Sequence, residues 1–270
     1  MRLSSATVPL LAGLLRPLVA TSVTVSDVNE LLANIANPNI SDITLAVSGS
    51  PYMLPSTISG VIRTLAIRAE TYGVVTISGG NARTLIEVIS AAADVHFHGL
   101  VLRDGYPGSN SGSGGCAWVS GGHLRFTQCT LTSHASHDYS GSDSGGFGGA
   151  FYLSGGTITL TSSEVSNNIA NKMGGVALMY GGIFVAHSTS FINNTVTGAD
   201  TISGIGGGGL FHVVGGNTLL SDCTIHGNSA GYGGVLEGAQ GSHVWSSCQI
   251  YSNRAIDSTI SSRCTHSALA

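Results

Sequence analysis

A Gly-Gly pair opens five blocks of nearly the same layout in this chain, and that repeat constrains the fold more than any other feature. The blocks begin at Gly114, Gly148, Gly174, Gly208 and Gly233. In four blocks a second pair follows seven residues later, beginning at Gly121, Gly155, Gly181 and Gly215. Fixed spacing of this kind predicts stacked coils rather than a globule with one closed core.

The spacing of the blocks sets the size of one coil. Successive blocks start 34, 26, 34 and 25 residues apart (148 minus 114 for the first), a base period of about 25 with two insertions of eight or nine residues. Such a coil can supply three short strands that pair in parallel with the next coil about 4.8 Å away. The sequence therefore predicts an all-β, right-handed parallel β-helix of about seven coils. A leucine-rich-repeat solenoid is disfavoured, because the blocks hold Thr, Val, Ser and Gly where a helix prefers Ala, Leu, Glu and Lys.

Asparagine recurs twenty residues into four of the blocks. The positions are Asn168, Asn194, Asn228 and Asn253, with His134 in the first block. Asparagine tolerates left-handed turns, and an amide stacked on its neighbour can both donate and accept. These residues predict an internal asparagine ladder, and ligand-binding amides are the alternative.

The chain before the blocks predicts a short helix followed by less regular coils. From Val25 to Asn37, apolar residues recur at helical spacing behind Ser26 or Asp27 as the N-cap. We expect this helix to cover the open end of the first coil. Strands are expected at 43–47, 64–69, 74–78, 85–90 and 95–103.

The expected organisation has three parts. Residues 1–24 contain Arg2, an apolar run and Ala20, which fits either a signal peptide or an N-terminal arm packed on the solenoid. Residues 25–256 form a single β-helix domain, and residues 257–270 form a C-terminal tail.

Composition excludes some classes of partner and site. The net charge is −4 and Lys172 is the one lysine, whereas nucleic-acid binding requires clustered cations.

Cys223 and Cys248 share one repeat position in adjacent coils, so a disulfide bridge and a buried stack of free thiols are both possible interpretations. No CxxC motif occurs, and we expect no metal site.

The repeats resemble a known family. An F-x-x-N element, intact from Phe191 to Asn194 and varied from Val165 to Asn168, resembles the repeats of chlamydial polymorphic outer membrane proteins. The stretch from TLAIRAETYGVVTISGG to VHFHGLVLRDG resembles the opening coils of pectin-lyase-like β-helix proteins. The resemblance implies the fold over about residues 25–256 and leaves the function open, because this fold hosts enzymes, adhesins and scaffolds.

The bacterial family continues into a membrane barrel. We expect no membrane-spanning barrel here, since no run of alternating ten-residue strands remains.

Candidate ligand contacts lie in the two insertions, which leave the solenoid at the same repeat boundary two coils apart. They are His137, Asp138, Tyr139, Asp143 and Asp200. Loops on a rigid scaffold commonly carry recognition, and Gly/Ser-rich loops without a ligand are the alternative.

Three further features are open to more than one interpretation. His96 and His98 point outward from one strand, either as a solvated pair or as two ligands of a shared metal. One repeat column, four residues into each block, can stack on sugar rings if it faces out and is core if it faces in; it holds Trp118, Tyr152, Leu178, His212 and Glu237. Asn39 and Asn193 begin sequons, so both are candidate glycosylation sites in a secreted chain.

Catalysis on this fold requires carboxylates brought together from neighbouring coils. The outward columns supply no such group of carboxylates from neighbouring coils, so we expect no catalytic residue and no cofactor. The predicted function is a non-catalytic, secreted or cell-surface scaffold or adhesin-like binding protein, with extracellular carbohydrate or surface proteins as partners. The alternative is a carbohydrate-active enzyme, a polysaccharide lyase or hydrolase, that uses the insertion acids with Arg125 or Lys172.

Overall fold

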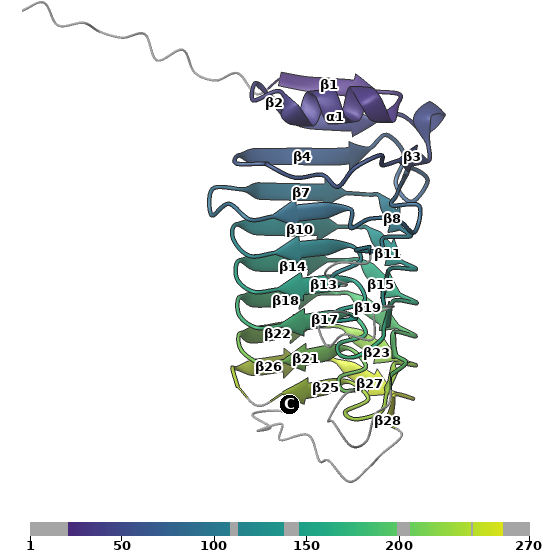
Figure 1. The fold of residues 1–270 in the computed structure, drawn as a ribbon, viewed down its shortest axis with the longest axis vertical. Coiled ribbons are helices and arrows are strands. Elements are labelled where there is room, and N and C mark those ends of the chain that lie inside the picture. The colour runs from purple at the N-terminus through teal and green to yellow at the C-terminus, as the bar shows by residue number, and fades with distance from the viewer. Residues whose placement is uncertain (1–20, 109–112, 138–145, 199–205, 239, 256–270) are drawn as a thin grey trace, which may run out of the picture.

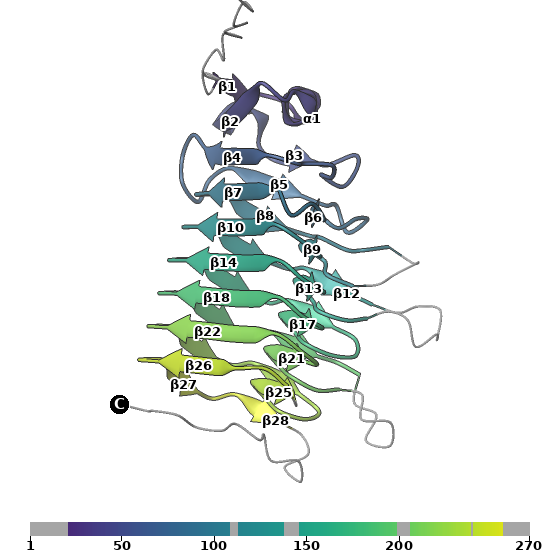
Figure 2. The same cartoon turned by 90° about the vertical axis from the view of Figure 1, so that its left-hand side faces the viewer.

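The chain folds as a parallel β-helix (Figures 1 and 2). The computed structural model describes residues 21–108, 113–137, 146–198, 206–238 and 240–255. The strands stack coil upon coil into four sheets, and each strand pairs in parallel with its counterpart in the next coil. The all-β parallel β-helix predicted from the repeats is confirmed.

The four sheets run along the length of the molecule. Sheet A contains, in spatial order, β1 (Thr21–Val25), β2 (Ile40–Leu45), β4 (Thr64–Ala69), β7 (Asp94–His98), β10 (His123–Thr127), β14 (Thr157–Thr161), β18 (Ile183–His187), β22 (Asn217–Ser221) and β26 (His243–Ser246). Sheet B contains β3 (Tyr52–Met53), β5 (Thr76–Ser78), β8 (Val101–Arg103), β11 (Thr130–Thr132), β15 (Glu164–Ser166), β19 (Ser190–Ile192), β23 (Thr224–His226) and β27 (Gln249–Tyr251). Sheet C contains β6 (Ile86–Val88), β9 (Ala117–Val119), β13 (Phe151–Leu153), β17 (Ala177–Met179), β21 (Phe211–Val213) and β25 (Leu236–Gly238). Sheet D contains β12 (Ala135–Ser136), β16 (Ile169–Ala170), β20 (Thr195–Val196), β24 (Ser229–Ala230) and β28 (Arg254–Ala255).

Single left-handed residues bend the chain between sheets A and B. In five successive coils these residues are Gln128, Ser162, Ser188, Asp222 and Ser247, with φ between 48° and 55°. The side chain that follows each bend donates to the carbonyl two residues before it, at 2.9–3.4 Å; the donors are Cys129, Ser163, Thr189, Cys223 and Cys248. A hydroxyl or thiol is therefore suited to this column, because it satisfies a carbonyl at the bend.

The leading Gly pair is required for two different reasons. Gly148 has φ +60°, a conformation that favours glycine. Gly149 lies so close to the next coil that a Cβ would collide with the carbonyl oxygen of Gly175. The first glycine turns the chain, and the second lets the coils approach.

Phenylalanine side chains form a continuous column in the core. The rings of Phe97 and Phe126 stack with centroids 5.5 Å apart, and the column continues through Phe151 and Phe184 to Phe211. All five side chains are fully buried. Aromatic pairs at these separations add to the hydrophobic free energy of burial.

Helix α1 (Val28–Ala36) covers the N-terminal end of the solenoid, beside β1 and β2 (Figure 2). Asp27 is the N-cap and accepts hydrogen bonds from the amides of Asn29 and Glu30. Leu31 and Ile35 are buried against the core. Among the described residues, no helix has the length and apolar character needed to cross a bilayer.

The less regular coils differ from the sequence-based expectation in detail. β1 pairs with β2, so residues 21–24, which precede the expected start at Val25, also belong to the solenoid. The strand expected at 95–103 is two strands, β7 and β8, because the chain bends at Gly99, where φ is +71°. A short 3-10 turn, η1 (Val47–Gly49), follows β2.

Candidate functional site

The repeated asparagines form a continuous ladder at the bend between sheets B and D. The Nδ2 atoms of Asn168, Asn194 and Asn228 each donate to the Oδ1 atom of the next asparagine at 2.9 Å. Their backbone amides donate to the same oxygens at 2.9–3.1 Å. Each Nδ2 also donates to a carbonyl of the preceding coil, as Asn253 does to Ile225 at 2.9 Å. These amides are occupied by the fold, and three of the four side chains are fully buried.

His134 occupies the ladder position of the first block. Its backbone amide donates to Asn168 Oδ1 at 3.0 Å, and its Nδ1 accepts from the amide of Gly105 at 3.1 Å. The imidazole therefore replaces an asparagine as an acceptor, through Nδ1, but its buried Nε2 has no hydrogen-bond partner among the described residues. Complete burial lowers its pKa to about 3, so the ring is neutral at physiological pH.

Most of the predicted loop contacts lie outside the described residues. These are Asp138, Tyr139, Asp143 and Asp200. His137 is described and half-buried, with its ring 6.3 Å from that of Tyr106. Of the two cations considered as partners for the acids, Arg125 Nε lies 2.7 Å from Asp94 Oδ1 on sheet A. Lys172 Nζ lies 5.6 Å from the centre of the Phe147 ring.

His96 and His98 project from the outer face of β7, as predicted from their spacing. Their ring centroids are 5.7 Å apart, His96 Nε2 lies 2.9 Å from Thr127 Oγ1, and His98 packs edge-on against Tyr72. Burial lowers the pKa of His96, and the charges of His98 and two arginines lower it further. Within the described ranges, no group of three or more His, Cys, Asp or Glu side chains is placed to hold a metal ion.

The outer face of sheet C carries a row of aromatic side chains. Trp118 and Tyr152 are paired in register on β9 and β13, with their rings T-shaped and 6.1 Å apart. Tyr180, just after β17, extends the row, with its ring 5.9 Å from that of Tyr152. Trp118 is 39% and Tyr180 is 51% exposed, whereas Leu178, the register neighbour of Tyr152 on β17, is fully buried. The column that could face either way is therefore open to solvent at Trp118 and buried at Leu178.

Polar side chains stand at both ends of the aromatic row. Glu87 is the register neighbour of Trp118 on one side. On the other side, His212 Nδ1 lies 3.1 Å from Glu237 Oε2, on the neighbouring strands β21 and β25. The aromatic row and its polar ends form one surface across six coils, which we call the sheet C face. Tyr180 was missed in the sequence because it lies two positions beyond the column, on the same side of the strand.

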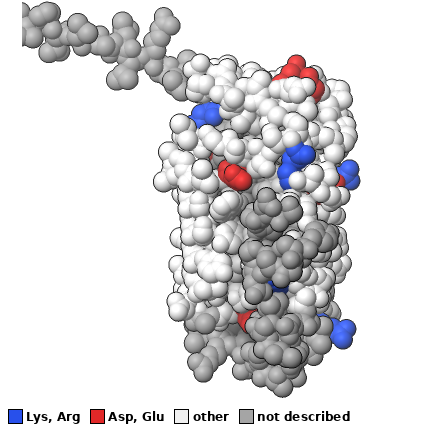
Figure 3. All heavy atoms as spheres, in the orientation of Figure 1, with Lys and Arg blue, Asp and Glu red and all other residues white. Residues whose placement is uncertain are grey.

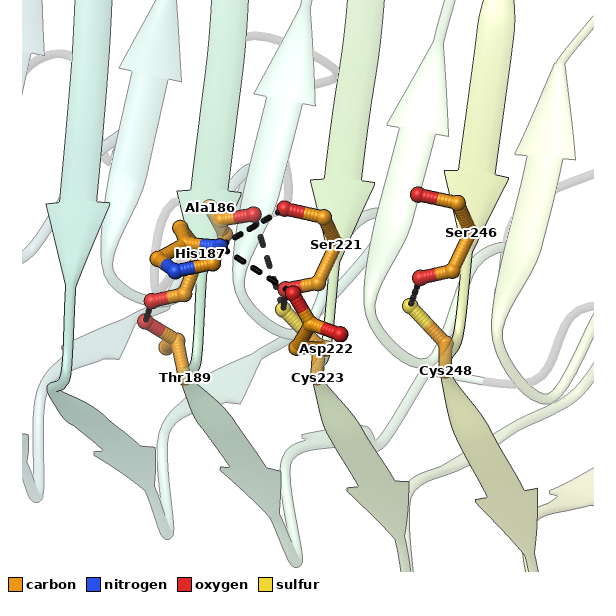
Figure 4. A network of polar contacts seen from close by, with 8 residues as sticks. All are labelled: Ala186, His187, Thr189, Ser221, Asp222, Cys223, Ser246 and Cys248. Carbon is orange, nitrogen blue, oxygen red and sulfur yellow. Dashed lines mark hydrogen bonds and ion pairs between the residues drawn. The ribbon is translucent and has the colours of Figure 1, made fainter.

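A second polar cluster surrounds His187 at the bend between sheets A and B (Figure 4). His187 Nδ1 lies 2.8 Å from Ser221 Oγ and 3.4 Å from Asp222 Oδ2. A catalytic triad requires the acid and the nucleophile on opposite ring nitrogens. Here both contacts involve Nδ1, so this geometry is not that of a triad. The nearby Cys223 thiol is buried, which raises its pKa to about 11.

Charged side chains are sparse on the face drawn in Figure 3, and the cations there are scattered. The predicted sequon residues are both exposed, Asn39 in the turn before β2 and Asn193 in the bend before its ladder neighbour. Their positions leave both side chains open to solvent.

Comparisons with known proteins gave no match: neither protein-family models, nor curated protein sequences, nor solved structures resemble this chain at a significant level.

Proposed function

We propose that this chain is a non-catalytic, secreted or cell-surface scaffold that binds extended carbohydrate on the sheet C face. The row of Trp118, Tyr152 and Tyr180, in which Trp118 and Tyr180 are exposed and Tyr152 is half-buried, carries the proposal. Clustered aromatic side chains on a protein surface mark interaction sites, because their burial in a complex removes a large apolar area from water.

The aromatic row suits a sugar polymer in particular. The apolar C–H face of a pyranose ring packs flat against an aromatic ring, and the hydroxyls at its rim need polar partners. Glu87 at one end and the His212–Glu237 pair at the other supply such partners. The rings of Trp118 and Tyr152 are nearly perpendicular, so one of them can lie flat against a sugar ring while the other contacts the glycan through its edge.

The row is also rigid. β9, β13 and β17 hydrogen-bond in register to one another, and the side chains on both sides of Trp118 and Tyr152 along their strands are buried. A preformed surface loses little conformational entropy when it binds. This favours a binding role over a surface that assembles only around its ligand.

Titration with cello-, xylo- and chito-oligosaccharides of increasing length tests the proposal. Affinity should rise with length until the glycan spans the row, and Trp118→Ala should weaken binding about tenfold or more. Leu219→Ala is the matched control, because Leu219 is 40% exposed but lies on sheet A. Equal affinity in the unmodified chain, Trp118→Ala and Leu219→Ala, or no binding to any glycan, would rule out the sheet C face as the site.

Incubation with the same glycans distinguishes this proposal from the alternative, a carbohydrate-active enzyme. Glycan cleavage that is lost in Asp138→Ala but kept in Trp118→Ala would place chemistry in the insertions and contradict the non-catalytic proposal. Intact glycan after prolonged incubation, together with binding, is the expected result.

A further inference from the structure

Cys223 and Cys248 lie one above the other between two pairs of register-matched strands. Ser221 pairs with Ser246 just before them, and Thr224 pairs with Gln249 just after. The amide of Gln249 donates to the Cys223 carbonyl at 2.8 Å. The two backbones are therefore about 4.8 Å apart, the spacing of neighbouring strands, which falls within the range of Cα separations that a disulfide spans.

The two thiols also point the same way. Cys223 Sγ donates to the Ser221 carbonyl and Cys248 Sγ to the Ser246 carbonyl, each at 3.3 Å (Figure 4). Burial raises the pKa of Cys223, and the charge and thiol of Cys248 are among the further causes. The side chains are thus stacked along the solenoid axis, and rotation about each Cα–Cβ bond turns the sulfurs toward each other.

Access to solvent differs among the four described cysteines. Cys116, Cys129 and Cys223 are buried, whereas Cys248 is only half-buried. Cys248 lies in the last described coil, whose outer rim is exposed. An oxidant in solution therefore meets Cys248 first, with Cys223 directly behind it.

We propose that Cys223 and Cys248 form a disulfide between coils when the protein meets a small disulfide oxidant such as oxidised glutathione. The Cys248 thiolate attacks one sulfur of the oxidant and releases one glutathione thiolate. The Cys223 thiol then loses its proton and attacks Cys248 Sγ, which releases the second glutathione. Two protein thiols are oxidised and one oxidant disulfide is reduced to two thiols. Each cysteine gives up only a weak S–H···O hydrogen bond.

The disulfide would fasten the last described coil to the one before it. Each coil of a stacked array contacts only its neighbours, so a covalent link between two coils restrains their separation. Formation in an oxidising compartment fits a secreted or surface protein, but the bond itself does not depend on what the sheet C face binds.

The test is a peptide map of the full chain after exposure to oxidised glutathione, with a reduced sample alongside. A Cys264→Ser background removes the fifth cysteine, which lies outside the described residues, as a competing partner. We expect one cross-link, between Cys223 and Cys248, and a midpoint of thermal unfolding higher by roughly 5 °C or more. Cys129→Ser should keep the cross-link and Cys248→Ser should abolish it. A glutathione adduct left on Cys248 beside a free Cys223, or a cross-link between any other pair, would overturn the proposal.

Discussion

Asn194 shows how one side chain can hold three coils together. It accepts from the side chain and backbone of Asn168, and it donates to Asn228 and to the Val165 carbonyl. Every polar atom of this buried amide is used. Removing it takes these hydrogen bonds from the Asn168 amide and the Val165 carbonyl of the preceding coil, in a buried site.

Asn194→Ala is therefore expected to lower the free energy of unfolding by about 1 to 3 kcal/mol. The control is Ser190→Ala, on the same coil, because Ser190 is only half-buried. Urea unfolding of the two variants measures the difference. If both variants unfold like the unmodified chain, the ladder contributes nothing to stability.

His134 makes the ladder sensitive to acid. Its pKa falls from an ordinary 6.5 to about 3 in the folded chain. A lowered histidine pKa means that folding favours the neutral ring, so its stabilising effect is full above pH 6.5 and is lost as the pH falls toward 3. The slope is up to about 1.4 kcal/mol per pH unit.

His134→Asn should reduce this acid sensitivity and extend the asparagine ladder by one coil. An amide can accept from Gly105 and donate to Asn168, and it does not titrate in this range. His96, His98 and His243, whose pKa values are also lowered, remain in both proteins and cancel in the comparison. Urea unfolding at about pH 7 and about pH 4 measures it. An unchanged pH dependence in the variant would show that His134 is not the titrating group.

Among the elements, α1 shows how a short helix is fixed to a solenoid. Arg63, in the turn before β4, donates through its guanidinium to the carbonyls of Ile35, Asn37 and Ile40 at 2.8–3.2 Å. These carbonyls lie at and just after the C-terminal end of the helix, where backbone acceptors lack partners within the helix. The contact joins the cap to the coil beneath it.

Arg63→Ala should cost about 1 to 3 kcal/mol and speed hydrogen exchange in α1. Arg68→Ala is the matched control. Its guanidinium pairs with Asp42 at 2.9 Å, but the two side chains are 41% and 32% exposed, so its loss should cost less than about 1 kcal/mol. Equal exchange rates of the α1 amides in both variants would show that Arg63 does not hold the cap.

The elements also show what the sequence could and could not predict. Asp27, the asparagine column and the apolar alternation follow simple local rules, so the helix, the ladder and the strand faces were predictable. β1 was not, because only its pairing with β2 makes it a strand. The bends between sheets A and B could not be predicted either. Residues such as Gln128 and Ser162 rarely adopt a left-handed conformation, and the stacking of the coils imposes it here.

The candidate site was predictable only in part, for a related reason. The sequence placed Trp118 and Tyr152 in one column but could not decide which way the column faces. That depends on which side of sheet C meets the core, and the buried neighbours of Trp118 settle it only in three dimensions. The insertions gave candidate residues but no geometry, because they interrupt the repeat from which the strand positions were predicted.

For the molecule as a whole, the first and the last described coils differ. α1 and β1 cover the N-terminal end, whereas the last described coil leaves Ile250 47% exposed. Ile225, its register partner one coil earlier, is fully buried. Because each coil contacts only its neighbours, the energetic value of one column position depends on how many coils flank it.

Ile225→Ala and Ile250→Ala test this gradient with the same chemical change in the same column. Ile225→Ala removes methyl groups from between two coils and should cost about 2 to 5 kcal/mol. Ile250→Ala removes them from a side chain that is about half exposed. The buried apolar area that is lost is therefore about half of that lost in Ile225→Ala, and no enclosed cavity forms. We expect a cost of about 1 kcal/mol. Urea unfolding of the two variants gives the free energies, and hydrogen exchange locates the effect. Equal costs would mean that further contacts cover Ile250 in solution and that the end of the last described coil is closed.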